Sequence, residues 1–596
     1  MICLARFNFS STAKKSMVSV DSFLGVDFTS TPENCDLRRS TDAPNMIRDT
    51  PGKNRKRNGY TLVHNFPGTV HGIHTINVEG KEKFFVHAGT SLYLKEENSY
   101  NEVYTGMNDA KSNSVVLNGM LVIIDGLRML CYDGETVTNM NSKAYVPTTI
   151  IGRRPSGGGT LYEPVNMISD FRIEKFKGDG SSKNFYISTG YAEYISYVQQ
   201  RVNGKWEYLS YDIHFDYTSA KGVVKFFNAP PAPSDGEDNI LICYRYANST
   251  YSNIINSCNI CTLYGINGAM DRIFITGSEK YPNRDYYCQI DDPTYWGDIW
   301  YGSLGKSDRP IMGYSLVAGY LAAHKTDEDS DANIILRTGE IIDDEPCFTI
   351  KGTYTSGGAV CNDCYGMLDN EPVYLSAGGI CAITPSDVLG ERFSQVRSYF
   401  LNGKLLKEKE MEKASAVVYN NFYMLLLNNT IYILDGLQSI VSSGEPFSHR
   451  QYEGYVWKNI PAVRLFSVGD TLYFGGKNGG LFRFYRDDEQ CYSDDGETFE
   501  SYWETAFYTG SDFSRYKTVT RLAVLLDSDS EKIEAEYKDA DGKWLIAAQG
   551  EKGRHSLCRK VHIKDCEGVK FRIRDTGNND FRINKLQFTY INGRNI

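Results

Sequence analysis

Hydrophobic and polar residues alternate along this chain in short runs that end at glycine, asparagine or aspartate. Alternation with a period of two is typical of half-buried β-strands, and these three residue types tolerate the positive φ angles of tight turns. Helical periodicity is scarce, and only one or two charged stretches, such as 404–414, are compatible with a short helix. The pattern therefore predicts an all-β protein.

Several of these runs share one theme, in which a buried-looking strand is followed by a tight turn and an aromatic-rich strand. They are the segments 83–97, 114–137, 271–289, 314–339, 370–385, 415–436 and 466–487. Repetition at intervals of tens of residues is typical of propeller blades, so we expect a β-propeller of about six to eight blades. No WD or kelch signature recurs, and one or two unrelated β-sandwiches are the alternative.

Two blocks depart from the repeating pattern. The strand-rich block at 165–250 predicts an inserted antiparallel sandwich. A Gly- and Pro-containing segment at 152–159 leads into this block, and another at 229–238 marks its last turn. Alternating strands near the end of the chain predict a second sandwich. The expected domains are an N-terminal arm (1–60), the first part of the propeller (61–164), the inserted sandwich or platform (165–250), the rest of the propeller (251–499) and the C-terminal sandwich (500–596).

Composition narrows the class of protein. With 596 residues, the chain exceeds what one hydrophobic core serves, since domains run about 100–200 residues. A hydrophobic share of 41% and a charged share of 23% indicate a globular rather than a disordered chain. The net charge of −10 opposes a grip on DNA, because neutralising phosphates drives nucleic-acid affinity. An acidic wall facing DNA would instead repel it and let it slide.

Targeting signals are not expected. No run of about 18 apolar residues occurs, so no membrane-spanning segment is predicted. Arg6 interrupts the short apolar stretch at the N-terminus, which argues against a secretory signal. The 14 cysteines are therefore expected to be reduced, buried thiols.

One short stretch concentrates positive charge. Its basic residues are Arg48, Lys53, Arg55, Lys56 and Arg57. Such a cluster suits docking onto an acidic neighbouring subunit or contact with DNA phosphates. A solvated loop flanked by strand-end charges is the plainer alternative, and the acidic net charge weakens the DNA interpretation.

An aromatic segment at 291–302 contains Tyr295, Trp296, Trp300 and Tyr301. Exposed, these side chains would suit contact with carbohydrate or protein, because aromatic residues dominate interface hot spots. Buried, they would form the core of a blade, and we favour this second interpretation while retaining the four as interface candidates.

Motifs for chemistry are weak. Two Cys-x-x-Cys pairs, Cys258/Cys261 and Cys361/Cys364, lie too far apart in sequence for a zinc ribbon, so unpaired thiols are favoured over zinc. Residues 493–499 nearly match the sialidase Asp-box, which is a turn motif of propeller blades. Acidic pairs at 291–292, 487–488 and 494–495 form no EF-hand. No HExxH, GxSxG or Walker motif occurs, so we predict no enzyme, no catalytic residue, no cofactor and no bound metal.

The segment 36–60 resembles the N-terminal signature of bacteriophage tail nozzle and packaged-DNA stabilisation proteins, of the form A-x-N-M … G-x-x-x-x-R-x-G. The matching residues are Ala43 to Met46, the Pro51-Gly52 turn and Lys56 to Tyr60. Further short segments resemble small sandwich modules of phage tail proteins. They are 176–181, 202–205, 222–226, 229–231, 492–496 and 503–505. The chain departs from the signature in an extra stretch before Ser22.

The resemblance implies a virion protein of the phage tail, assembled in the cytoplasm of the host bacterium. Such β-propeller subunits form a ring, commonly a hexamer, below the portal and adaptor and beside tail fibre or spike proteins. The ring continues the DNA channel, retains the packaged double-stranded genome without sequence-specific binding, and releases it on ejection. The alternatives are a receptor- or glycan-binding tail protein and, less favoured, a propeller glycosidase.

Overall fold

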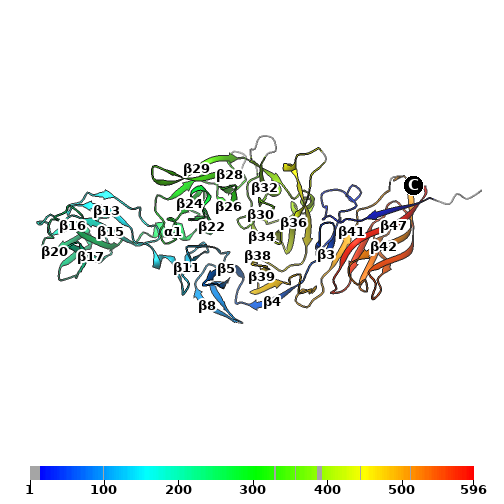
Figure 1. Ribbon diagram of the computed structural model, residues 1–596, viewed down its shortest axis with the longest axis horizontal. Coiled ribbons are helices and arrows are strands. Elements are labelled where there is room, and N and C mark those ends of the chain that lie inside the picture. The colour runs from blue at the N-terminus through cyan, green and yellow to red at the C-terminus, as the bar shows by residue number, and fades with distance from the viewer. Residues whose placement is uncertain are drawn as a thin grey trace, which may run out of the picture. The chain divides into compact units, whose positions relative to one another are not determined.

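The computed structural model describes residues 14–97, 99–327, 331–355, 357–385, 392–442, 444–510 and 512–596. Almost all of its regular structure is β-strand (Figure 1). The chain divides into two compact units. The first combines Met1–Val70 with Ser356–Ile596, and the second is His71–Thr355. Among the described residues, no helix combines the length and apolarity needed to cross a membrane.

The second unit contributes four four-stranded antiparallel blades within the described residues. Their strands are β5 (Val70–Val78), β6 (Lys81–Ala88), β7 (Ser91–Glu96) and β8 (Ser99–Thr105); β9 (Asn113–Leu117), β10 (Met120–Ile124), β11 (Met129–Tyr132) and β12 (Val137–Asn139); β22 (Ile260–Leu263), β23 (Ile273–Thr276), β24 (Arg284–Tyr287) and β25 (Tyr301–Ser303); and β26 (Ile311–Val317), β27 (Tyr320–Lys325), β28 (Ile334–Ile342) and β29 (Glu345–Tyr354).

The first unit contributes three more blades in the part of the chain that is described. Their strands are β30 (Tyr365–Leu368), β31 (Glu371–Ser376), β32 (Gly379–Pro385) and β33 (Arg392–Val396); β34 (Ser415–Tyr419), β35 (Phe422–Leu427), β36 (Thr430–Ile440) and β37 (Gln451–Trp457); and β38 (Arg464–Val468), β39 (Thr471–Gly475) and β40 (Gly480–Phe484) with β4 (Tyr60–Asn65). Strand β4 precedes the other three strands of its blade by hundreds of positions in the sequence, and it pairs antiparallel with β40.

These seven blades confirm the predicted β-propeller class. Each of the seven repeating segments seen in the sequence supplies strands to a different blade. The turns use the expected residues: Asn420 and Asn421 both adopt positive φ between β34 and β35. The charged stretch 404–414 behaves differently from the expectation. The helix α2 (Tyr399–Leu405) ends at the second residue of this stretch, because Leu405 is the last buried apolar position before a mostly exposed, charged run.

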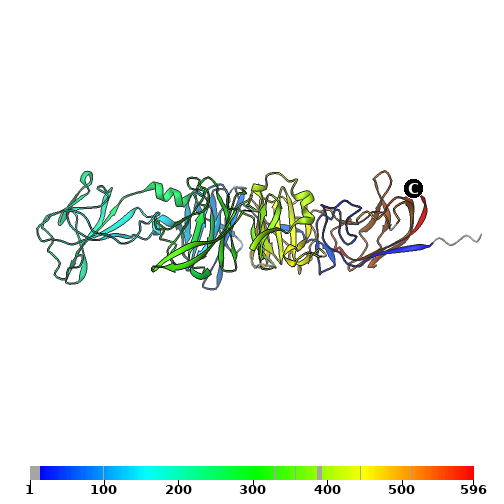
Figure 2. The ribbon, with the colours of Figure 1, turned by 90° about the horizontal axis from the view of Figure 1, so that it is seen from above.

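A sandwich interrupts the second unit between two of its blades (cyan to green in Figures 1 and 2). Its larger sheet has the order β14-β13-β15-β21-β17-β18, and its smaller sheet has the order β16-β20-β19. Apolar residues of both sheets, including Phe176, Phe185, Phe226 and Ile242, form its core. The strands are β13 (Thr148–Arg153), β14 (Thr160–Leu161), β15 (Phe171–Phe176), β16 (Asn184–Tyr186), β17 (Tyr194–Val202), β18 (Lys205–Leu209), β19 (Phe215–Thr218), β20 (Val223–Phe226) and β21 (Ile240–Arg245).

A second sandwich ends the chain, and the N-terminal segment is part of it. One sheet has the order β2-β3-β47-β42-β45 with β1 also paired to β47, and the other has the order β41-β46-β43-β44. The N-terminal strands are β1 (Lys15–Val20), β2 (Met46–Arg48) and β3 (Asn54–Lys56). The C-terminal strands are β41 (Ser501–Glu504), β42 (Arg515–Leu526), β43 (Ile533–Lys538), β44 (Trp544–Gln549), β45 (Ser556–Cys566), β46 (Phe571–Asp575) and β47 (Arg582–Asn595). Three segments of the expected arm, β1, β2 and β3, are thus built into a sheet.

The core of the inserted sandwich allows a direct test of the fold. Phe226 is 2% exposed, and its ring centroid lies 4.8 Å from that of Phe185. We expect Phe226→Ala to lower the local free energy of unfolding by about 3–5 kcal/mol, because it removes buried apolar area and leaves a cavity. Hydrogen exchange of peptides from β16 and β20 would measure the change. Tyr208→Ala, at a side chain 70% exposed, is the control and should stay within about 0.5 kcal/mol of the wild type.

Candidate functional site

The residues of the N-terminal signature, 43–60, lie inside the first unit. Ala43, Met46 and Arg57 are fully buried, and Asn45 is almost so. At Gly59, a Cβ atom would lie 1.8 Å from the carbonyl oxygen of Ser493, so the backbone contact admits only glycine. The segment therefore acts as an internal structural element rather than as a surface arm.

Arg57 is the centre of this element. Its guanidinium donates two hydrogen bonds to the carboxylate of Asp494, with Nη1–Oδ1 of 2.8 Å and Nη2–Oδ2 of 2.6 Å. Its Nε donates to Oδ1 of Asn45 at 3.0 Å, and the amide of Asn45 donates to the carbonyl of Glu500. The guanidinium carbon of Arg57 lies 3.8 Å from the ring centroid of Phe499, over the face of the ring. A bidentate pair of this kind is both strong and geometrically specific.

Two further arginines anchor the segment to the blade of β36 and β37. The Nε of Arg48 donates to Asp435 at 2.6 Å, and the Asp435 side chain is fully buried. Arg39 forms a buried pair with Glu453, in which the Nε–Oε2 distance is 3.1 Å. Burial raises the pKa of Glu453, although Arg39 acts in the opposite direction.

The remaining basic candidates also find partners within the first unit. The Nζ of Lys56 lies 2.8 Å from Asp575, and neither side chain is exposed. Arg55 donates to Asp487 at 2.6 Å, and Lys53 lies 3.2 Å from Asp527. Of the five predicted basic residues, Lys53 alone is substantially exposed, at 44% of its side chain. The structure brings these cations into intramolecular ion pairs and does not gather them on one surface.

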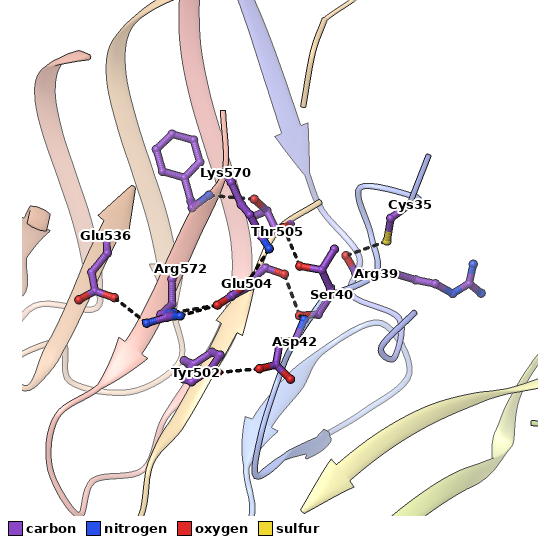
Figure 3. Close-up of polar contacts among 12 residues, drawn as sticks. Cys35, Arg39, Ser40, Asp42, Tyr502, Glu504, Thr505, Glu536, Lys570 and Arg572 are labelled. Carbon is purple, nitrogen blue, oxygen red and sulfur yellow. Dashed lines mark hydrogen bonds and ion pairs between the residues drawn. The ribbon is translucent and has the colours of Figure 1, made fainter. Parts of the chain in front are cut away.

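A second polar cluster, shown in Figure 3, joins residues 40–42 to β41. The hydroxyl of Tyr502 donates to Asp42 at 2.7 Å, and the ammonium groups of Lys404 and Lys458 lie 3.0 and 3.2 Å from the same carboxylate. Burial by itself would raise the pKa of Asp42. The two lysines and the tyrosine hydroxyl outweigh burial and hold this pKa below its ordinary value.

Glu504 organises the other half of this cluster. Its carboxylate accepts from Arg572 and lies 2.7 Å from the Nζ of Lys570, while its carbonyl accepts the Ser40 hydroxyl at 2.7 Å (Figure 3). Arg572 also faces Glu536 at 3.6 Å. Every carboxylate in this cluster is neutralised by a cation, which suits cohesion of the domain better than proton transfer to a substrate.

Two cavities lie in the first unit, and the first of them borders the N-terminal segment. One of about 350 Å³ is lined by Arg48, Arg55, Arg57 and Trp457 among others, and the buried indole N–H of Trp457 has no hydrogen-bond partner. The other, of about 710 Å³, lies in the C-terminal sandwich beside Tyr537. Within the described residues, no group of three or more His, Cys, Asp or Glu side chains is arranged to hold a metal ion.

The four aromatic candidates divide between core and surface. Tyr295 and Trp296 are buried, with the Tyr295 hydroxyl donating to the carbonyl of Pro164 and the Trp296 indole donating to that of Pro293. Trp300 is half-buried and its ring centroid lies 4.7 Å from that of Tyr295. Tyr301 is 42% exposed. The segment therefore serves mainly as packing, with one ring at the surface.

The weak chemical motifs also have structural partners. Cys258 and Cys261 belong to the second unit, whereas Cys361 and Cys364 belong to the core of the first. Burial raises the pKa of Cys258. The near-match to the Asp-box is a turn in which backbone groups of Asp494 and Glu497 bond to each other. Two residues of the acidic pairs noted in the sequence, Asp487 and Asp494, form ion pairs with Arg55 and Arg57.

Sequence reasoning missed the acidic partners and Asp42. Tyr502 is 460 residues from Asp42, and Asp494 is 437 residues from Arg57. Neither periodicity nor motif spacing connects residues at such separations. The glycine at position 59 was a signal in the sequence that another stretch of backbone, here at Ser493, passes close to the segment.

Comparisons with known proteins add little. The sequence matches no protein-family model and no curated protein sequence. Among solved structures, the chain is similar to the computationally designed Ika8 protein (10% identity, 72% of this chain and 100% of that one, TM-score 0.30) and to the AfRom2 CNH domain (8%, 72% and 99%, 0.32). It is also similar to an exo-β-1,3-galactanase from Phanerochaete chrysosporium (11%, 55% and 96%, 0.19). These TM-scores are too low to support any inference about activity.

The Arg57 pair yields a stability prediction. Arg57→Ala leaves the Asp494 carboxylate without its cation in a nearly buried site, so we expect the free energy of unfolding to fall by about 3–5 kcal/mol. Urea denaturation followed by tryptophan fluorescence would measure it. Lys53→Ala removes an exposed partner and should change stability by less than about 0.5 kcal/mol. Equal effects of the two changes would contradict the anchoring role.

The Asp42 cluster predicts a pH dependence. The pKa of Asp42 is below its ordinary value of 3.8 in the folded protein. Its contribution to stability is therefore complete above that ordinary value and is lost as the pH falls through the lower folded pKa. We expect the stability difference between wild type and Asp42→Asn to be constant near neutral pH and to shrink under acid. Denaturation of both proteins across this pH range tests it, and a difference that grows under acid would be the wrong sign.

Proposed function

We propose that this chain is a structural subunit of a bacteriophage tail, forming a nozzle ring that continues the DNA channel beyond the portal and adaptor. The observation that carries the proposal is the buried junction of Asn45, Arg57 and Asp494. The residues of the A-x-N-M and R-x-G signature meet there and hold the N-terminal segment to the loop before β41. The signature thus has a structural use, as an assembly protein requires.

The charge distribution supports passage of DNA without binding. The net charge is −10, and the basic cluster expected from the sequence is neutralised by carboxylates of the same chain. Repulsion between an acidic lumen and phosphates would let the genome slide until ejection. The proposed assembly is a hexameric ring, with adaptor or portal proteins on one side and fibre or spike proteins beside it.

A receptor- or glycan-binding role is the second candidate, and one observation favours it. The inserted sandwich exposes several tyrosines, among them Tyr162 at 61%, Tyr194 at 48% and Tyr211 at 50%. Exposed aromatic rings with polar tips are common in binding surfaces. A glycosidase uses a pair of carboxyl groups that flank the scissile bond. The carboxylates of Asp42 and Glu504 are instead paired with lysines, which does not favour that role.

Cryo-electron microscopy of the native particle that contains this chain distinguishes the two candidates. The nozzle proposal expects a ring of propellers coaxial with the portal and a lumen lined mainly by acidic side chains. A lumen lined by lysine and arginine would count against DNA sliding by repulsion. A peripheral position with the exposed tyrosines pointing outward would overturn the nozzle proposal in favour of receptor binding.

A further inference from the structure

Lys56 and Asp575 meet inside the C-terminal sandwich from opposite sheets. Lys56 ends β3 in the six-stranded sheet, and Asp575 ends β46 in the four-stranded sheet. The two residues are 519 positions apart in sequence, yet Nζ lies 2.8 Å from Oδ2. Both side chains have zero exposure. An amine and a carboxyl group are therefore held in contact where bulk water does not reach them.

The surroundings position both groups closely. The N–H of Gly577 donates to Oδ1 of Asp575 at 3.0 Å, and Nζ of Lys56 donates to the carbonyl of Gly577 at 2.9 Å. The ring centroid of Phe499 lies 4.3 Å from Nζ. The carboxyl oxygen that is not in contact with Nζ thus has a backbone donor, and the amine has a backbone acceptor on its other side.

Burial shifts both groups of this pair toward their neutral forms. Burial lowers the pKa of Lys56 and raises the pKa of Asp575, in each case against the attraction between the two groups. The neighbouring Arg57 also lowers the pKa of Lys56. A neutral amine is a nucleophile and a neutral carboxylic acid is an electrophile, so the pair is suited to condensation.

We propose that Lys56 and Asp575 form an intramolecular isopeptide bond that joins the two sheets of the C-terminal sandwich. A proton passes from the ammonium to Oδ2 along their hydrogen bond, and the nitrogen lone pair then attacks Cγ of Asp575. The Gly577 N–H stabilises the charge that develops on Oδ1. The Nζ–Cγ bond forms, the Cγ–Oδ2 bond breaks, and Oδ2 leaves as water with the transferred proton and a second proton from nitrogen. No oxidant or cofactor is consumed, and charge is conserved.

Contact alone is not the criterion, as another buried lysine pair illustrates. The Nζ of Lys325 lies 2.9 Å from Asp331. Asp331 is partly exposed. Burial by itself would raise its pKa, but hydrogen bonds from the Lys325 ammonium and from the N–H groups of Lys306 and Ala332 outweigh burial and lower this pKa. Its carboxylate stays ionised and is a poor electrophile. This pair should remain an ordinary ion pair and serves as the matched control.

The bond would clamp the N-terminal segment covalently to the C-terminal sandwich. It would close almost the whole chain into one loop, so that unfolding of any blade could not release the two ends of the first unit from each other. This inference concerns chemistry within the chain and does not depend on the proposed place in a phage tail.

Mass spectrometry of the full chain, denatured and reduced, tests the proposal. We expect an intact mass one water molecule below that of the sequence, and a protease digest in which the peptide with Lys56 is linked to the peptide with Asp575. An intact mass equal to that of the sequence, with both peptides unlinked, would overturn the proposal. So would a water loss confined to one linear peptide, since that indicates a cyclised aspartate.

Two variants locate the bond. Asp575→Ala and Lys56→Arg should each have the full mass of their own sequence and yield no linked peptide. Asp331→Ala should keep the linked peptide and the missing water. Because mass is read on the denatured chain, a folding defect cannot hide the bond once it has formed. Loss of the linked peptide in Asp331→Ala, with retention in Lys56→Arg, would overturn the assignment.

Discussion

Burial of the positive charges of the N-terminal segment is the constraint on which the first unit depends. Arg39, Lys56 and Arg57 lie in the interior, where an unpaired charge costs several kcal/mol. Each must meet a carboxylate at hydrogen-bond distance, and each partner lies on a different element: Glu453 on β37, Asp575 on β46 and Asp494 on the loop before β41. The segment can satisfy all three only in one position, which fixes the blade and the sandwich together within this unit.

Close backbone packing reinforces this constraint. At Gly25, a Cβ atom would lie 2.1 Å from the carbonyl oxygen of Gly454 on β37, and the N–H of Val26 bonds to that same carbonyl. The N-terminal segment thus runs against the blade through main-chain contacts that any side chain would break. Charge pairing selects the partners, and the absence of side chains allows the segment to approach closely enough to reach them.

These two features explain the cohesion of the candidate site. Asp42 is held by two lysines and a tyrosine, and Glu504 by a lysine and an arginine. The two lysines and the tyrosine hold the pKa of Asp42 below its ordinary value, whereas general acid–base catalysis relies on a pKa near the working pH. The exposed tyrosines of the inserted sandwich, by contrast, leave about half of their side-chain surface or more open to another molecule.

The sequence by itself determined the fold class, because strand alternation and turn residues are local signals that act within about ten residues. The seven repeating segments, the inserted sandwich and the C-terminal strands all follow from that pattern. Only the tertiary structure decided that β1, β2 and β3 join the C-terminal sheet and that Arg48, Arg55, Lys56 and Arg57 face carboxylates of their own chain. The partners of these four residues lie hundreds of positions away. A charge in the sequence looks the same whether it will face water, another subunit or a distant carboxylate, and only folding brings the partner within reach.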